Sequence, residues 1–142
     1  MKNLMMIAAV SLGMTVSACA QVKIPVAVKN AFQKEYPGTK VKWEKEGGNY
    51  EAGFEQKGHE MSVIYTPTGV ATEKEMEMAV SELPKSISDY VSQHMKGAKI
   101  KGAAKITKSN GELQYEAVVN GKDVMFTSDG KLVKAAKEEE KD

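Results

Sequence analysis

The chain contains one pattern twice, and this repeat restricts its fold more than any other feature. Ile24-Pro25 recurs 59 residues later as Leu83-Pro84. The apolar residues that follow match at the same offset, Val28 with Ile87, Phe32 with Val91 and Tyr36 with Met95. Residues spaced by four lie along one face of a helix, and a proline suits a first helical turn. The sequence predicts two units, residues 21–80 and 81–134, each beginning with a helix.

After each predicted helix, the apolar residues alternate with polar ones. In the first half the apolar set is Val41, Trp43, Tyr50, Ala52, Phe54, Met61, Val63 and Tyr65. In the second half Ile100, Ala104 and Ile106 are expected to lie opposite Lys99, Lys101 and Lys105, and Leu113, Tyr115, Ala117, Val124 and Phe126 continue the pattern. Alternation of this kind indicates antiparallel strands with one buried and one wet face. The aromatic members of the first set are expected to pack against the helix.

Turns recur at similar places in both halves. They are Gly47-Gly48, Lys57-Gly58 and Thr68-Gly69 in the first half, and Asn110-Gly111, Asn120-Gly121 and Asp129-Gly130 in the second. Asn-Gly and Asp-Gly between alternating runs are strong hairpin signals. Each half therefore reads as a helix and a meander of about four strands, with last strands near 70–78 and 131–134. The predicted fold class is α+β, with two tandem helix-plus-four-strand units.

The N-terminus has the layout of an export signal. A lysine at position 2 precedes an apolar run from Leu4 to Val16, which is too short to span a bilayer as a mature helix. Cleavage after residue 20 would remove a signal peptide of residues 1–20. Alternatively, Val16-Ser17-Ala18-Cys19 resembles a lipobox, so that the signal is residues 1–18 and Cys19 carries lipid. Residues 135–142 are predicted to be a solvated tail.

Four segments resemble a known family. They are residues 24–38, residues 41–52, Ser81-Glu82-Leu83-Pro84, and residues 121–132, which read Gly-Lys-Asp-Val-Met-Phe-Thr-Ser-Asp-Gly-Lys-Leu. The family is the exported bacterial group of β-lactamase-inhibitor-like, PepSY-like proteins. The resemblance implies two sheets joined into one curved antiparallel surface with both helices packed behind it. It implies no catalytic residues, and its only suggestion of a partner is a secreted peptidase. The inhibitor's disulfides and acidic hairpin have no counterpart here, so we do not expect β-lactamase inhibition.

Composition and motifs exclude several function classes. All 20 basic residues are lysines against 19 acids, and the near-zero net charge argues against nucleic acid as a partner. His59 and His94 lack the spacing of a metal site, and Cys19 is the only cysteine. Carboxylates on wet strand faces, Glu73, Glu75 and Glu77 among them, are expected to keep their ordinary pKa. No cofactor or enzymatic activity is predicted.

The predicted function is therefore recognition of another secreted or envelope protein by the open face of the sheet, a face of mixed lysine and glutamate with a few apolar side chains. Ile64, Val118 and Met125 are apolar residues at positions that otherwise face water. The candidate binding residues are Lys42, Glu51, Glu55, Ile64, Lys99, Lys101, Glu116, Val118 and Met125. Membrane contact is expected only through Cys19. The alternatives are a periplasmic carrier of a small ligand and a structural lipoprotein.

Overall fold

The computed structural model describes residues 22–135, so the predicted signal peptide, Cys19 and residues 136–142 of the predicted tail lie outside the described residues. The helices are α1 (Val26–Glu35), the short 3-10 helix η1 (Val80–Glu82) and α2 (Lys85–His94). The strands are β1 (Lys42–Glu46), β2 (Asn49–Gln56), β3 (His59–Tyr65), β4 (Ala71–Met78), β5 (Ile100–Lys108), β6 (Leu113–Val119), β7 (Lys122–Thr127) and β8 (Leu132–Ala135). The predicted last strands were each within one residue of β4 and β8.

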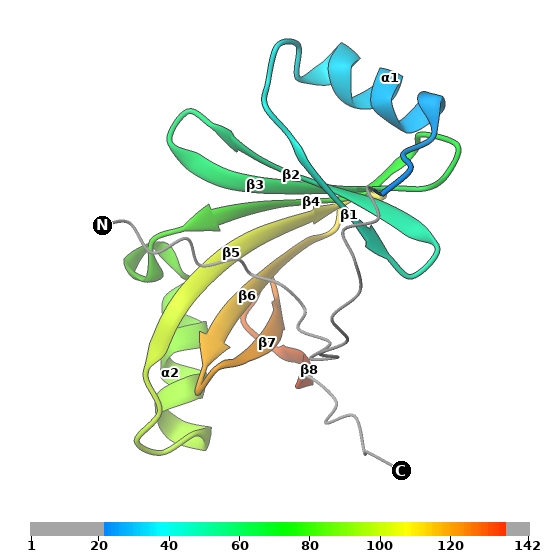
Figure 1. Ribbon diagram of the computed structural model, residues 1–142. Coiled ribbons are helices and arrows are strands. Elements are labelled where there is room, and N and C mark those ends of the chain that lie inside the picture. Colours follow the sequence, from blue (N-terminus) through cyan, green and yellow to red (C-terminus); the bar gives the residue numbers. More distant parts are fainter. Residues whose placement is uncertain (1–21, 136–142) are drawn as a thin grey trace, which may run out of the picture.

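The strands form one antiparallel sheet of eight strands in chain order. Figure 1 shows that this sheet is strongly twisted, with α1 on the outer side of β1–β4 and α2 on the outer side of β5–β8. The register puts both helices on the same face. Ala52 lies beneath α1 and pairs with Val63, which in turn pairs with Lys74 of β4. Met78 lies on the same side of β4 as Lys74, and it pairs with Ala103 beneath α2. The predicted antiparallel sheet with two helices is confirmed.

The core under α1 is largely aromatic. Phe32 is 2% exposed, and its ring lies 5.3 Å from Tyr36, 5.5 Å from Trp43 and 5.1 Å from Phe54, between ring centroids. Tyr65 of β3 belongs to the same cluster and is 1% exposed. These rings lie on the predicted apolar face, so the expectation that they pack against the helix is confirmed.

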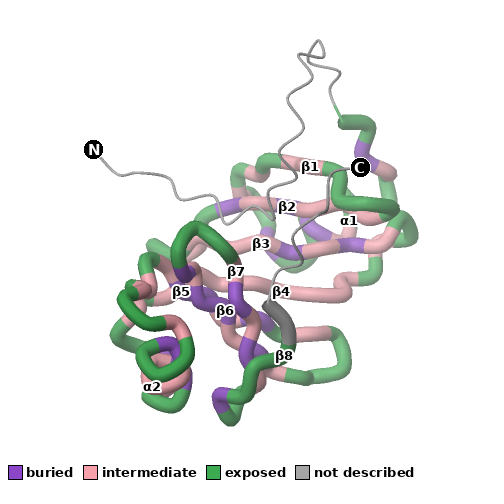
Figure 2. The backbone as a smooth tube through the Cα atoms, turned by 90° about the horizontal axis from the view of Figure 1, so that it is seen from below, coloured by how far each residue is buried: buried purple, intermediate pink, exposed green. Residues whose placement is uncertain are grey.

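The core under α2 is smaller and mostly aliphatic. Ile87 and Val91 of α2 are buried against Ala103, Ala117 and other residues of the last four strands. Figure 2 shows this buried region running through β5, β6 and β7. The two helices thus bury the same positions of the repeat, but with side chains of different size.

One part of the predicted alternation is wrong. The β5–β6 register shifts between Ile100 and Gly102, because an irregularity there adds a residue to β5. Ile100 therefore lies on the helix side as expected, but Ala104 and Ile106 lie on the opposite side, where they pair with Glu116 and Gln114. A period of two cannot show such an insertion, because one extra residue exchanges the two faces.

The last turn of each half touches the first turn of its helix. Gly69 has φ +86° and donates to Thr66 O at 2.9 Å, and Gly130 has φ +83° and donates to Thr127 O at 2.9 Å. A Cβ on Gly69 would lie 2.6 Å from the carbonyl oxygen of Ala27, the second residue of α1. A Cβ on Gly130 would meet Ser86, the second residue of α2. A glycine at the equivalent turn of each half therefore lets that turn pack against the first turn of its helix.

Replacing Gly69 by alanine is expected to lower the free energy of unfolding by roughly 2–4 kcal/mol. The left-handed φ is unfavourable for alanine, and the new methyl group would press on a backbone oxygen that cannot rotate away. Thermal unfolding followed by circular dichroism measures the effect. Gly48→Ala is the control, since a Cβ there meets nothing within 4 Å. Equal melting temperatures for the two variants would contradict the close contact between the Gly69 turn and α1.

Candidate functional site

The face of the sheet that neither helix covers is called the open face. The register assigns to it Lys42, Glu44, Glu51, Glu55, Glu60, Ile64, Glu73, Glu75, Glu77, Ala104, Ile106, Lys108, Gln114, Glu116, Val118, Asp123 and Met125. Carboxylates dominate it, whereas Lys74 and Lys105 lie on the helix side. The open face is therefore acidic rather than the predicted mixture of lysine and glutamate.

Small and apolar side chains form the floor of the open face. Ala104 is 0% and Ile106 is 2% exposed, and Ile106 lies between Glu75 and Gln114 in the ladder. The predicted apolar residues also lie on this face and are partly buried. Val118 pairs with Asp123, so Met125 is its diagonal neighbour, while Ile64 lies on β3, with β4 and β5 between. Val118 and Met125 are therefore neighbours, whereas Ile64 lies apart from them, opposite Glu73 of β4.

Glu116 lies over this floor and is the most buried of the acids. It is 6% exposed, and its Oε1 has no hydrogen-bond partner. The cause is local, because its neighbours on the adjacent strands are Ala104 and Met125, whose side chains carry no donor. A buried oxygen without a donor is costly, and native structures contain few of them.

The pKa values of two carboxyls on the open face are strongly raised. Burial raises the pKa of Glu75 to about 8, and the negative charges of Glu116, Glu51, Glu73 and Asp123 raise it further in the same direction. Burial also raises the pKa of Glu116 to about 7, with contributions from Asp123 and Glu73. For Glu75 and Glu116 the expectation of an ordinary pKa is wrong, because both carboxyls are buried over an apolar floor and are crowded by other carboxylates.

Neighbouring acids respond in the same direction. Burial raises the pKa of Glu51 and of Asp123, and it raises the pKa of Glu60 together with the charges of Glu77 and Glu55. A face in which each carboxyl raises the pKa of another has a strongly negative potential once ionised. Such a face attracts cations.

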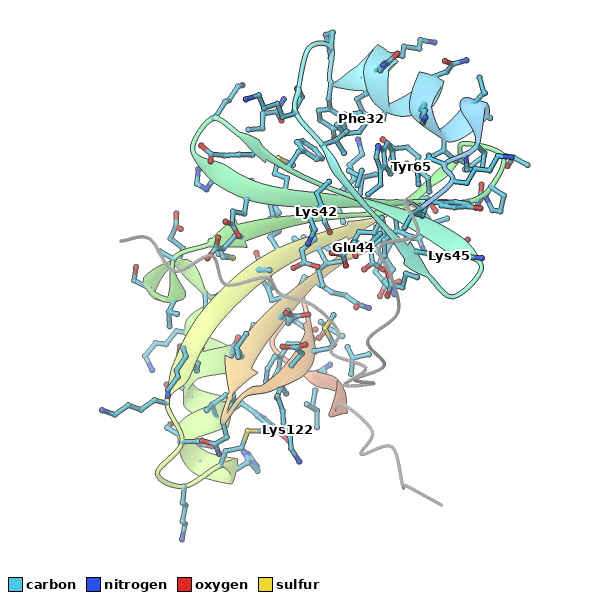
Figure 3. All side chains as sticks on the ribbon, in the orientation of Figure 1. Phe32, Lys42, Glu44, Lys45, Tyr65 and Lys122 are labelled. Carbon is cyan, nitrogen blue, oxygen red and sulfur yellow. The ribbon has the colours of Figure 1, made fainter. Side chains whose placement is uncertain are left out.

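The other predicted binding residues lie at the margins of this face. Lys42 forms an ion pair with Glu44 at 2.7 Å, and Figure 3 shows both side chains on the side of β1 opposite Phe32. Glu55 is exposed near the end of β2. Lys99 immediately precedes β5 and Lys101 lies within the register shift; both are exposed. The structure thus groups Glu116, Val118 and Met125, while the register assigns neither Lys99 nor Lys101 a paired position on the open face.

The centre of the open face lies outside what the sequence patterns predict. Patterns within single strands do not single out Asp123, they predict an ordinary wet glutamate at Glu75, and they assign Ala104 and Ile106 to the other side. One signal was available: Gly102, since a glycine inside a strand pattern often marks a bulge. The pairing of Glu75 and Glu116 with a shared floor depends on cross-strand register, which no single-strand pattern contains.

A second hollow lies at the first edge of the sheet. It is an open groove of about 540 Å³ between the end of α1 and the start of β1. Its lining includes Lys29, Phe32, Tyr36 and Trp43. The carrier alternative predicts an apolar pocket; this groove is open to solvent, but aromatic rings line it.

Across residues 22–135, no three His, Cys, Asp or Glu side chains lie close enough to hold a metal ion. No helix in that same range has both the length and the apolar character needed to cross a membrane.

Solved structures share this fold at low sequence identity. A protein described as one of the "putative periplasmic proteins" of Bacteroides eggerthii is 17% identical, with TM-score 0.71 over 80% of this chain and 88% of that chain. A BLIP-like protein of Bacteroides fragilis is 20% identical, with TM-score 0.65 over 87% and 94%. A DUF2874 family protein of Bacteroides uniformis is 17% identical, with TM-score 0.70 over 80% and 88%.

The family comparison covers both repeats. No curated protein matches the chain in sequence. The family model described as "Putative beta-lactamase-inhibitor-like, PepSY-like" matches residues 14–72 and again residues 70–134. Two consecutive matches of one model agree with the internal repeat and with the equivalent helix-contacting turns at Gly69 and Gly130. The chain therefore belongs to the β-lactamase-inhibitor-like, PepSY-like family.

Proposed function

We propose that the chain is an exported, non-enzymatic binding module that recognises another secreted or envelope protein through its open face. The observation that carries this proposal is a sheet face covered by neither helix, in which apolar side chains lie among carboxylates. Apolar side chains at the centre of a patch with a polar rim are typical of protein interfaces. In this proposal each helix and the four strands after it form one unit, and the open face runs across both.

Export is supported by two independent features. The N-terminal sequence has the order of an export signal, and a protein of the same fold is described as periplasmic. We infer a location in the periplasm or on the outer membrane, the latter if Cys19 is lipidated. The names of the family and of the Bacteroides fragilis protein point to inhibitor-like recognition, with a secreted peptidase as the proposed partner class.

A small-ligand carrier is the second candidate. The groove beside α1 favours it, because aromatic rings of Phe32, Tyr36 and Trp43 line the groove together with the ammonium of Lys29. The groove and the open face lie on opposite sides of β1, so the two candidates use different residues. Substitutions on one surface therefore test one function without touching the other.

The double substitution Ile64→Thr with Val118→Thr is expected to weaken partner binding about tenfold or more. Threonine keeps the branched shape that suits a strand but removes apolar contact. The tagged chain would capture its partner from envelope extract, and the affinity of each variant for the purified partner would then be measured. Val26→Thr with Val70→Thr is the matched control, because Val26 is 71% and Val70 57% exposed outside the open face. Equal affinities for the two double variants would exclude the open face as the binding site.

A further inference from the structure

We propose that the open face receives a cationic segment of the partner protein, with one ammonium or guanidinium group lying against Glu116. This inference rests on the proposed function and adds the chemistry of the partner to it. It can fail while the open face remains the binding site.

The first argument is the unpartnered oxygen. Glu116 is 6% exposed, and its Oε1 accepts no hydrogen bond. Ala104 on β5 has only a methyl group, so the ladder leaves no long side chain between Glu116 and the acidic strand β4. An N–H donor entering there would satisfy Oε1 with a charge-assisted hydrogen bond, which is among the stronger ones in proteins.

The second argument is the distribution of charge. The groups that act on Glu75 and Glu116 are carboxylates from β2, β4 and β7, namely Glu51, Glu73 and Asp123. The described lysines of the open face are Lys108, opposite Glu73, and Lys42, which forms an ion pair with Glu44. Lys74 lies on the helix side and pairs with Glu35. The crowded carboxylates therefore lack a strong internal counter-charge at their centre.

The spread of the acids across the sheet favours a peptide over a metal ion as the bound group. A metal needs several ligands at one point, and no such group exists within residues 22–135. The acids are instead spread across the sheet over a floor that includes Ile106, with Met125 beside Glu116. Lysine and arginine bury their aliphatic stems on apolar surfaces while their charged ends meet acids. An extended segment with basic and apolar residues fits both parts.

The arrangement also predicts that binding releases protons. At neutral pH Glu75 and Glu116 are partly protonated in the free protein, because burial and their acidic neighbours raise their pKa values. A bound cation favours the ionised carboxyls and so lowers those values. Binding should therefore tighten as the pH rises from 6 to 8.5, and its heat should depend on the ionisation enthalpy of the buffer.

The test uses the chain from Gln21 and three peptides of equal length. One alternates lysine or arginine with leucine, the second replaces each base by glutamate, and the third replaces each base by serine. Isothermal titration at pH 6, 7 and 8.5 is expected to show tight binding only for the basic peptide. Glu116→Gln is expected to weaken that binding about tenfold or more and to reduce the proton release. Glu82→Gln, which removes an exposed acid of η1 outside the open face, is expected to change that binding less than about twofold.

Each other outcome overturns the inference. No binding of the basic peptide, or equal binding by Glu116→Gln and Glu82→Gln, would remove Glu116 as the receiving group. Calcium binding in a titration with calcium chloride alone, if it disappears in Glu116→Gln, would point to a metal ion instead of a peptide. If the captured partner needs Ile64 and Val118 but tolerates Glu116→Gln, the cationic segment is wrong and the proposed function stands. If the partner also binds the double variant Ile64→Thr with Val118→Thr as tightly as the parent, the proposed function is also wrong.

Discussion

Raising the pH from 5.5 to 8.5 is expected to destabilise the folded chain by on the order of 2–4 kcal/mol. The folded-state pKa values of Glu75 and Glu116 are about 8 and about 7, above the ordinary value of 4.5. Between these limits the native state holds protons that the unfolded chain has released, so the free energy of unfolding falls as the pH rises. The stabilising contribution is complete below about pH 4.5 and is lost through pH 7–8.

Urea unfolding at four pH values across this range measures the slope. Glu75→Gln with Glu116→Gln is expected to flatten it and to make the protein more stable than the parent at pH 8.5, because glutamine cannot acquire the buried charge. Glu82→Gln with Glu112→Gln removes two exposed acids and should leave the slope unchanged. A parent protein that is equally stable at pH 5.5 and 8.5 would show that these carboxyls are not raised.

Replacing Phe32 by alanine is expected to cost roughly 3–5 kcal/mol of unfolding free energy. The side chain is 2% exposed and meets three other rings with centroids 5.1 to 5.5 Å away, so its removal leaves a cavity in the centre of the first core. Those rings come from β1, β2 and the residue that follows α1, so the loss loosens the contact between helix and sheet.

Trp43 reports this loss directly. It is the only tryptophan of the chain and lies 5.5 Å from Phe32 between ring centroids. Its fluorescence follows the first half, while circular dichroism follows the whole sheet. Val26→Ala on the same helix is the control and should change stability by less than about 0.5 kcal/mol, because Val26 is 71% exposed. A cost for Phe32→Ala within that limit would mean that the first core does not hold α1.

Much of the fold was predictable because its signals are local. The spacing of Val28, Phe32 and Tyr36 predicts a buried helical face, and the alternation after it predicts strands. The glycine turns separate those strands into hairpins. The one error in β5 arose where the regular period is interrupted near Gly102, and the positions after the interruption were assigned to the wrong face.

Less of the candidate site was predictable, because it depends on what neighbouring strands place beside each residue. Glu116 and Val118 were identified from their position on the wet side of one strand. That Oε1 of Glu116 has no donor follows from its neighbours Ala104 and Met125. That the pKa of Glu75 is about 8 follows first from its burial in the sheet and then from the charges of acids on other strands. These are properties of the assembled sheet, which single-strand patterns do not contain.

The order of the strands also bears on how the molecule is made. Every strand after β1 pairs with the strand that precedes it in the chain. A chain that emerges N-terminus first, from a ribosome or from a membrane pore, can therefore complete α1 and β1–β4 before α2 has appeared. Each later strand then meets an edge that is already in place, and no segment waits for a distant partner. Such short-range pairing favours rapid folding and shortens the time for which apolar surface is exposed to aggregation.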